Sequence, residues 1–568
     1  MITRYALISL FMVALVSPLS GQMNPSDKML RDEVNRYGQA DVSIAYPGRE
    51  ATRLITKNVS ITSIREGKVY ISLSKLTVEW FIAAKFEYTI FPRAERKGMT
   101  TATSLSQAMD WQSYPSYPQY LSIMKSFAEN YPSICRLDTI GVSVNGQLVL
   151  ALKISDHVSV EEDEPQVFYS STIHGDELGG FVLMLRLTDY LLKNYATDQR
   201  AKNLVDNLEI WINPLSNPDG SYNHDTTVNS AMRYNHYGYD LNRNFPDPGD
   251  PGIVYQVETS KMVSFMKKHR FVISANFHAG DEVVNYPWDR WQRLHADNDW
   301  LNYISRMYAD TVHKYSVSNY LTDLDNGVTN GFAWYNINGG RQDYMTYERQ
   351  GREVTIELDY TKVTPALQLD SLWKYNWRSL LGYLENALYG IHGHVKDASS
   401  GLPVVARVFI TGHDKDSSQV YSDSINGSFT RMLMPGIWNL TFTANGYRDT
   451  TISNINVNSF EETILEVNMD PVTTPVDTTH PFLPYIWPNP GSSDIKCVLP
   501  DFLTGTINIT FFDRLGRKIK SYLQEYLQGD QMVINVDGLP SGVYYIDFKK
   551  VSSGVSRTSR IIVSGKNH

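Results

Sequence analysis

The stretch Gln166-Val-Phe-Tyr-Ser-Ser-Thr-Ile-His-Gly-Asp-Glu-Leu-Gly179 decides the fold of the largest part of the chain. It opens with aromatic and β-branched residues that favour a strand, and the pattern from Gly180 to Tyr195 predicts a long helix directly after it. Strands that alternate with helices predict one large α/β domain over residues 110–388. The other predicted strands of this domain include Leu208–Ile212, Phe271–Phe277 and Val354–Leu358.

The N-terminal part of the chain predicts two shorter segments. An apolar run after Arg4, followed by small residues up to Gly21, is typical of a cleaved secretory signal and predicts a signal peptide at residues 1–21. Short alternating runs in residues 22–105 predict a small α/β unit with a basic, polar end. This unit is either an inhibitory pro-region, detached near Arg96, or a permanent scaffold.

The C-terminal part of the chain changes in character from about Tyr389 onward. Short strands bounded by turns predict a β-sandwich at residues 389–470 and another β unit at 485–568. A stretch rich in proline and threonine, residues 471–484, is typical of a linker between them.

Composition excludes several classes of function. The chain has 568 residues, with 52 Lys+Arg against 61 Asp+Glu and a formal net charge of −9, so it is a poor candidate for binding nucleic acid. No segment beyond the signal is long and apolar enough to predict a membrane span. The two cysteines, Cys135 and Cys497, exclude a disulfide-rich scaffold or a cysteine zinc cluster and favour two unpaired thiols.

Three residues indicate a metal site at the edge of the predicted sheet. His174 and Glu177 lie where a strand ends and a helix begins, and imidazole with carboxylate is a standard catalytic zinc set. This His-x-x-Glu spacing has little force by itself. His278 follows another predicted strand, at the kind of position where α/β sheets carry their sites, and supplies the third ligand that catalytic zinc requires.

Charged residues elsewhere in the domain allow two interpretations. Arg233 and Arg243 lie in a turn-rich region that is either a solvated loop or a carboxylate-binding site, since arginine offers a bidentate fork to a planar anion. Glu357 stands inside an otherwise apolar strand, where a carboxylate is costly unless it is paired or functional.

Taken in order, these motifs resemble those of the zinc metallocarboxypeptidases, the M14 family, and most nearly its carboxypeptidase N/E branch. The resemblance covers about Trp111 to Tyr389. It implies a mixed-sheet catalytic domain that holds a zinc ion (Zn2+) on His174, Glu177 and His278.

The same resemblance implies roles for five further residues. Glu357 matches the general base, and Arg233 matches the arginine that polarises the scissile carbonyl. Asn242 and Arg243 match the pair that grips the terminal carboxylate of the substrate, and Tyr335 matches the mobile tyrosine that closes over it.

The sequence departs from the family pattern after the third ligand. It reads Ala-Gly-Asp-Glu there, so Asp281 and Glu282 add negative charge near the expected pocket, with Gln342 and Asp343 on the opposite loop. The branch leans to C-terminal Lys or Arg, and these acids are compatible with that preference. Solvated loop acids explain them equally well.

The two C-terminal units carry resemblances of their own. Residues 389–470 resemble the transthyretin-like, regulatory-like domain of the N/E branch, to which no catalytic role is assigned. Residues 485–568 resemble the C-terminal sorting domain of the type IX secretion system, on motifs that include Leu-Pro-Ser-Gly-Val-Tyr-Tyr-Ile at 539–546. This implies export across the outer membrane by that machinery to a secreted or cell-surface location; a generic adhesive β-sandwich is the alternative.

The sequence therefore predicts a secreted zinc carboxypeptidase that acts on the C-termini of peptides or proteins. Two alternatives stay open: an amidase or peptidase on peptidoglycan stem peptides, and a non-catalytic surface binding protein with a decayed site. The complete set of ligands, base and arginines argues against decay.

Overall fold

The computed structural model describes residues 24–91, 100–250, 252–472, 484–487, 494–500, 503–527 and 531–563. The chain forms two compact units, Met1–Pro471 and Val472–His568. The predicted signal peptide, the segment around Arg96 and most of the predicted linker at 471–484 lie outside the described residues.

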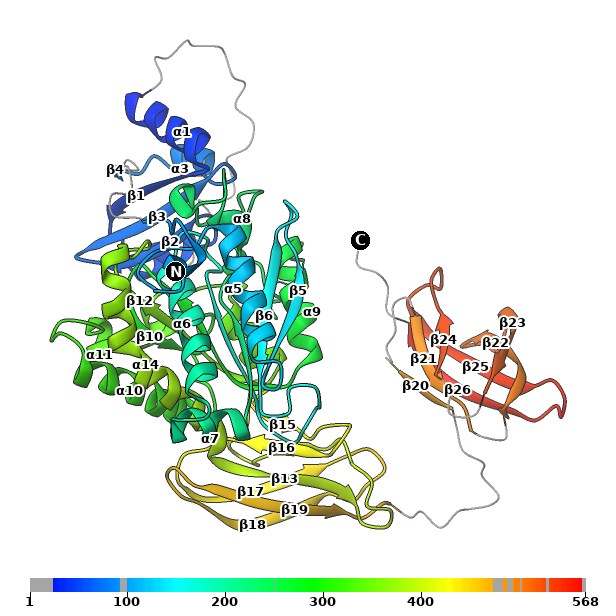
Figure 1. The fold of residues 1–568 in the computed structure, drawn as a ribbon. Helices are drawn as coiled ribbons and strands as arrows, with labels where there is room; N and C mark the ends of the chain where they lie inside the picture. The colour runs from blue at the N-terminus through cyan, green and yellow to red at the C-terminus, as the bar shows by residue number, and fades with distance from the viewer. Residues whose placement is uncertain are drawn as a thin grey trace, which may run out of the picture. The chain divides into compact units, whose positions relative to one another are not determined.

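The large α/β domain, which the resemblance predicts to be catalytic and which we call the catalytic domain, is built on an eight-stranded sheet with the strand order β11-β10-β12-β9-β7-β8-β6-β5. Figure 1 labels β10 and β12 toward one side of this sheet and β5 and β6 toward the other. The four strands β8, β7, β9 and β12 run parallel, whereas β5, β6 and β10 make antiparallel pairs, so the prediction of a mixed sheet is confirmed. The strands are β5 (Cys135–Val142), β6 (Leu148–Ile154), β7 (Gln166–Ser171), β8 (Glu209–Asn213), β9 (Phe271–His278), β10 (Glu282–Tyr286), β11 (Val328–Asn330) and β12 (Arg352–Leu358).

Helices cover both faces of this sheet. One face packs against apolar side chains of α5, α6, α7, α10 and α14, and the other against those of α9 and α13. A capping box at Ser116 begins α5. The helices are α4 (Leu105–Ala108), α5 (Tyr117–Asn130), α6 (Gly179–Asn194), α7 (Gln199–Asn207), α8 (Pro218–Ser221), α9 (Val257–Lys268), α10 (Asn298–Tyr315), α11 (Asp323–Gly327), α12 (Gly331–Trp334), α13 (Arg341–Glu348) and α14 (Leu369–Glu385).

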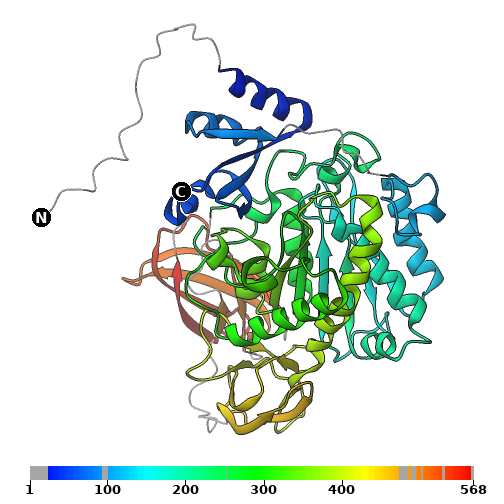
Figure 2. The ribbon, with the colours of Figure 1, turned by 90° about the vertical axis from the view of Figure 1, so that its left-hand side faces the viewer.

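Residues 24–91 form a small N-terminal unit with an antiparallel sheet in the order β2-β3-β1-β4. Its apolar core is continuous with Tyr335 and Ile337 of the catalytic domain, against which the unit, blue in Figure 2, packs. Its elements are α1 (Pro25–Tyr37), β1 (Gln39–Ala45), α2 (Arg49–Ile55), β2 (Ser60–Arg65), β3 (Lys68–Ser74), α3 (Val78–Ala83) and β4 (Tyr88–Phe91).

A β domain follows the catalytic domain at Gly390. Its two sheets, β16-β13-β19 and β15-β14-β17-β18, enclose one apolar core, in agreement with the predicted sandwich. The strands are β13 (Gly390–Asp397), β14 (Arg407–Phe409), β15 (Val420–Tyr421), β16 (Ser428–Arg431), β17 (Gly436–Thr443), β18 (Thr450–Val457) and β19 (Glu462–Met469).

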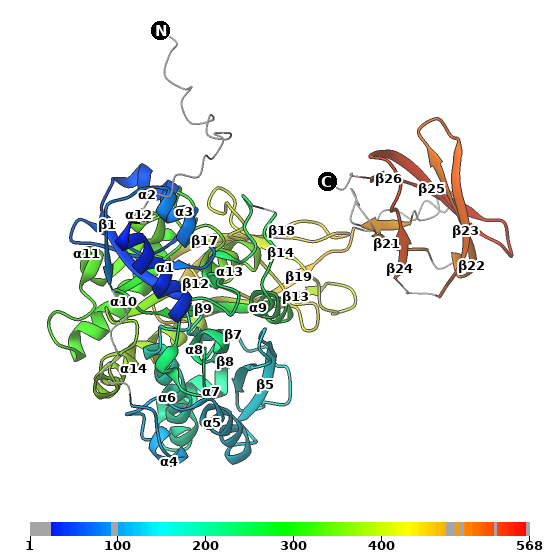
Figure 3. The same cartoon turned by 90° about the horizontal axis from the view of Figure 1, so that it is seen from above.

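The second compact unit is also a β structure, with sheets β20-β21-β24 and β23-β22-β25-β26 around its own core (Figure 3). Its strands are β20 (Tyr485–Trp487), β21 (Asp494–Val498), β22 (Gly505–Asp513), β23 (Lys518–Tyr526), β24 (Met532–Asn535), β25 (Gly542–Lys550) and β26 (Ser556–Val563). Cys135 and Cys497 are both buried and unpaired, so the prediction of free thiols is confirmed. Among the described helices, none combines the length and the hydropathy that a membrane span requires.

Candidate metal centre and substrate pocket

The turn between β7 and α6 carries two of the predicted metal ligands. This turn lies so close to the chain at Gly220 that a Cβ on Gly175 would approach the Gly220 carbonyl carbon to 2.3 Å, which only glycine avoids. The Gly175 amide also donates to the Arg233 carbonyl oxygen at 3.1 Å. The close approach places His174 and Glu177 next to the segment that carries Arg233.

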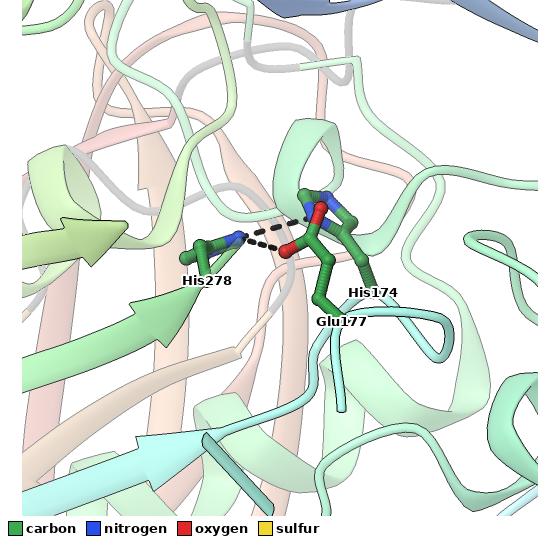
Figure 4. A group of neighbouring side chains, drawn as sticks. All are labelled: His174, Glu177 and His278. Atoms are coloured by element: carbon green, nitrogen blue, oxygen red, sulfur yellow. Dashed lines mark hydrogen bonds and ion pairs between the residues drawn. The ribbon is translucent and has the colours of Figure 1, made fainter. Parts of the chain in front are cut away.

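The structure brings His174, Glu177 and His278 together in a buried cluster (Figure 4). The carboxylate of Glu177 lies between the two rings, with Oε1 2.9 Å from His174 Nδ1 and Oε2 2.7 Å from His278 Nδ1. The two Nδ1 atoms are 3.0 Å apart. All three predicted ligands therefore direct a ligand atom at one point.

The outer nitrogen of each imidazole is held by a neighbouring side chain. His174 Nε2 lies 3.1 Å from Asp240 Oδ1, and His278 Nε2 lies 2.8 Å from the side-chain amide of Asn276. Asn276 Oδ1 has no partner among the described residues, and turning the amide over gives the ring an acceptor. A hydrogen bond at Nε2 fixes the orientation of each ring so that Nδ1 faces the metal position, as the same kind of hydrogen bond does for histidines in known zinc sites.

The protonation states of the cluster also suit a zinc ion. Burial lowers the pKa of His278 to about 4, so the ring is neutral and has a lone pair for a metal. Burial opposes ionisation of Glu177, but the two adjacent histidines hold its pKa well below the usual range. Two imidazoles and one carboxylate form a catalytic zinc donor set, and the residues present fit the ion.

Arg233 and Glu357 lie beside this cluster. Arg233 Nη1 donates to Glu177 Oε1 at 3.0 Å, while its Nε and Nη2 donate to Asp240 Oδ2 at 3.1 and 3.0 Å. Glu357 on β12 pairs in register with His278 on β9, and its Oε2 has no partner among the described residues. Burial, with the nearby charge of Glu177, raises the pKa of Glu357 well above its usual range.

The predicted substrate-binding residues line the same cavity, together with Thr62 of the N-terminal unit. Arg243 Nη1 donates to the Asn242 carbonyl oxygen at 2.9 Å, but its buried Nε and Nη2 have no partner among the described residues. Tyr335 donates its hydroxyl to the Ile61 carbonyl oxygen at 3.4 Å. The free volume is ≈ 20 Å³, which is about enough for one water molecule.

Besides Glu177 and Glu357, the cavity wall contains a third acidic residue, Asp289, which sequence analysis missed. It is buried after β10, and its Oδ1 accepts from Asn285 Nδ2 at 2.9 Å and from Gln342 Nε2 at 3.1 Å. Asp289 lies among Asn285, Arg243 and Tyr335 in the cavity wall. Asp289 follows Tyr286, the last residue of β10, by three positions and belongs to none of the motifs that the sequence analysis used.

The acids that the sequence suggested for this pocket lie elsewhere. Asp281 and Glu282 are absent from the described cavity wall, because Asp281 faces Ser63 of the N-terminal unit and Glu282 accepts from the Leu321 amide. Asp343 accepts from the Asp289 and Arg290 amides and so fixes the turn that carries Asp289.

Comparison with known proteins places this site in a family. Residues 120–379 match the model of the zinc carboxypeptidase family. The chain is 33% identical over 389 residues to carboxypeptidase D of Homo sapiens. The alignment covers 64% of this chain and 27% of that protein. It is 32% identical over 342 residues to carboxypeptidase M of Mus musculus, with 57% of this chain and 77% of the relative covered.

A third relative is the carboxypeptidase N catalytic chain of Rattus norvegicus, at 30% identity over 390 residues, covering 61% of this chain and 83% of the relative. The chain spans about a quarter of the length of the carboxypeptidase D proteins that it matches. Residues 485–564 match the model of a secretion system C-terminal sorting domain, which confirms the predicted secreted or cell-surface location. The chain belongs to the zinc carboxypeptidase family, is related to carboxypeptidases D, M and N, and ends in a secretion sorting domain.

Proposed function

We propose that this protein is a secreted, zinc-dependent carboxypeptidase that removes the last residue of peptides and proteins. The observation that carries the proposal is the position of the unpartnered Arg243 Nε and Nη2 in the wall of the cavity that also holds the His-Glu-His cluster. An arginine with two free, buried donors suits a carboxylate. A terminal carboxylate bound there brings the last peptide bond of a substrate to the metal ligands and Glu357.

The residues around the cluster then have distinct roles. His174, Glu177 and His278 would hold a zinc ion, which would supply a Lewis acid for acidifying water and polarising the scissile carbonyl. Glu357, whose buried carboxyl readily holds a proton, accepts one from the attacking water and delivers it to the leaving amine. Arg233, fixed by Glu177 and Asp240, donates to the carbonyl oxygen as negative charge develops on it.

The substrate-binding residues restrict the reaction to chain ends. Arg243, with Asn242 beside it, requires a carboxylate that only a C-terminus supplies. Tyr335 closes over the bound residue once its hydroxyl leaves the Ile61 carbonyl oxygen.

The pocket favours a basic C-terminal residue. Asp289 lies next to two buried oxygens that have no donor among the described residues, Asn285 Oδ1 and Gln342 Oε1. Three acceptors at one place suit the several N–H donors of a lysine or arginine side chain. A substrate ending in glutamate would instead bring a second negative charge to Asp289.

The N-terminal unit acts as an inhibitory pro-region. It closes the cavity through Thr62 and accepts the Tyr335 hydroxyl on Ile61. Gln39 accepts from the Arg233 amide at 2.6 Å, and Ser60 donates to Asp240 at 2.6 Å. With a free volume of ≈ 20 Å³, a peptide enters only after this unit moves away.

The C-terminal unit directs export through the type IX secretion machinery and is removed in the process. Mass spectrometry of the secreted protein measures where the mature chain ends. Mature chains without residues 485–564 support this step, and an intact C-terminus in the medium contradicts it.

Release of single amino acids from peptides that end in Arg, Lys, Phe or Glu tests the function. We expect zinc-dependent release after limited proteolysis detaches the N-terminal unit, fastest for Arg and Lys. Asp289→Asn should lower kcat/KM for Arg-ended peptides by roughly 30-fold and leave Phe-ended peptides within about threefold. Release that survives a zinc chelator would overturn the proposal.

A further inference from the structure

A second group of atoms in the catalytic domain contacts a guanidinium, near the start of β10 and away from Asp289. The cation is Arg65, from β2 of the N-terminal unit. Its Nη1 donates to the Gly280 carbonyl oxygen at 3.3 Å and lies 4.0 Å from Asp281 Oδ1. Its guanidinium carbon lies 5.2 Å from the centroid of the Tyr360 ring. A carbonyl, a carboxylate and an aromatic face all attract cations.

Asp281 has unused capacity to bind a cation. It is 4% exposed, and its Oδ2 has no partner among the described residues. The contacts of its other oxygen come from the N-terminal unit, where Ser63 Oγ donates at 3.0 Å and Arg65 lies further away. A buried carboxylate oxygen without a donor is unfavourable. A cation that donated to both oxygens of Asp281 would therefore bind here more strongly than Arg65, which lies 4.0 Å from one of them.

The position of Asp281 relates this group to the reaction. Asp281 comes three residues after the ligand His278, and the Gly280 amide donates to the Asp359 carbonyl oxygen at 2.7 Å, two residues beyond Glu357. The group therefore adjoins the reacting centre.

The two acidic sites lie at opposite ends of one strand. Asn285, which bonds Asp289, is four residues along β10 from Asp281, a span of about 13 Å. Neighbouring side chains of an extended peptide point in opposite directions. A substrate whose last side chain reaches Asp289 thus points its penultimate side chain away from Asp289, and Asp281 is the acidic residue at the other end of the strand.

We propose that Gly280, Asp281 and Tyr360 form a subsite for a cationic side chain at the penultimate position of the substrate. Arg65 occupies this subsite while the N-terminal unit covers the site. Its side chain is 35% exposed and 4.0 Å from the carboxylate, a loose contact that a substrate residue replaces. The assignment rests on the proposed carboxypeptidase function and narrows the substrates to chains that end in two basic residues.

Three peptides that all end in Arg, with Arg, Ala or Glu at the penultimate position, test the subsite. The full chain is assayed before and after limited proteolysis detaches the N-terminal unit. We expect kcat/KM about tenfold higher for Arg-Arg than for Ala-Arg, chiefly through KM, and lowest for Glu-Arg. Asp281→Asn should bring the Arg-Arg to Ala-Arg ratio within about twofold of one, chiefly by slowing Arg-Arg hydrolysis.

Two further variants separate the subsite from damage to the fold. Tyr360→Leu, at a ring that is 40% exposed, should lower the Arg-Arg to Ala-Arg ratio roughly threefold. Asp325→Asn, an acid whose side chain is 85% exposed, is the control and should leave the ratio unchanged.

The possible outcomes distinguish this subsite from the function it rests on. Equal hydrolysis of the three peptides by the wild type refutes the subsite and leaves the carboxypeptidase function standing. The subsite is also refuted if both variants, Asp281→Asn and Tyr360→Leu, keep the wild-type Arg-Arg to Ala-Arg ratio. Absence of hydrolysis of all three peptides refutes the function and the subsite together.

Discussion

The catalytic domain has two neighbours in the first compact unit, and it contacts them in different ways. The N-terminal unit reaches site residues through uncharged side chains, which hydrogen-bond to carboxylates and to a backbone amide. Gln39 Nε2 donates to Asp176 at 3.0 Å, and Gln39 Oε1 accepts from the Arg233 amide. Ser60 donates to Asp240. A bond between uncharged groups contributes about 0.5–1.5 kcal/mol, and a bond to a carboxylate about 1.5–3 kcal/mol.

The β domain is attached through a buried network of charges. Asp297 of the catalytic domain accepts from Arg352 Nη2 at 2.6 Å, Arg431 Nη1 at 2.7 Å and His413 Nε2 at 2.8 Å. Arg431 also pairs with Asp414 at 2.7 Å. Removing one member of such a network leaves uncompensated buried charge, at a cost of about 3–5 kcal/mol.

The contrast supports the proposal that the N-terminal unit is the neighbour released from the catalytic domain. The N-terminal unit covers the site through separate hydrogen bonds that can be broken one by one. The residues of the charge network named above lie outside the described wall of the metal cavity. The first contact suits release, and the second suits permanent attachment.

Asp297→Ala should have the largest effect. It removes the shared acid of the network, so the free energy of unfolding of the first compact unit should fall by about 3–5 kcal/mol. Urea unfolding followed by tryptophan fluorescence measures the change. Asp299→Ala, an exposed acid in the first turn of α10, is the control. A fall of less than about 1 kcal/mol in the free energy of unfolding would contradict the contrast, because the charge network would then be no stronger than the contacts of the N-terminal unit.

Gln39→Ala should have an intermediate effect, on inhibition rather than on the catalytic domain. It removes two hydrogen bonds to the catalytic domain, one of them to a carboxylate, and weakens the binding of the N-terminal unit by about 2 kcal/mol or more. The uncut chain should therefore hydrolyse Arg-ended peptides at least about thirtyfold faster. Initial rates before and after detachment of the N-terminal unit check this.

Once the unit is detached, the Gln39 variant and the wild type should have equal rates. Lys28→Ala, which removes an exposed ion pair with Asp32, should leave the uncut chain unchanged. Equal activity of the uncut wild type and the Gln39 variant would argue that the unit is a scaffold and no inhibitor.

The smallest effect expected is a pH dependence of the binding between the N-terminal unit and the catalytic domain. Burial raises the pKa of Asp281 to about 7, with Asp323 and Glu282 adding to the rise and Ser63 and Arg65 opposing it. The packed state thus keeps a proton that an exposed aspartate releases near pH 4. Packing is favoured fully below that pH and loses this contribution as pH rises through about 7.

Gel filtration measures this dependence on chains cut between the N-terminal unit and the catalytic domain. The unit should dissociate several-fold more at pH 8 than at pH 5, and Asp281→Asn should flatten the difference. Dissociation rather than activity is the readout, because Glu357 titrates as well. Tighter binding at pH 8, or an unchanged profile in the variant, would contradict the assignment.

Local pattern predicted the metal ligands, because His174 and Glu177 share one turn and His278 ends a strand of the same sheet. Asp289 could not be found in this way, since its partner Gln342 is 53 residues away and only the packing of α13 brings them together. Asp281 was expected at the pocket, but it lies just before β10, whereas Asn285, further along the strand, lines the cavity.

The contacts of the N-terminal unit were beyond sequence analysis for the same reason. Gln39 and Asp176 are 137 residues apart, and neither lies in a motif that suggests the other. Tyr335 was expected as a mobile residue over the substrate, yet nothing in the sequence pattern indicated that it joins the apolar core of the N-terminal unit.

A pair of peptides that differ only at the C-terminus, one a free acid and one an amide, tests the central claim most directly. Both are offered to the zinc-loaded chain after the N-terminal unit is detached, with a chelator and with Glu357→Gln as controls. We predict release of the terminal basic residue from the free acid alone, abolished by the chelator and lowered at least about a hundredfold by the variant. Equal cleavage of the amide, or release that persists without metal, would contradict it.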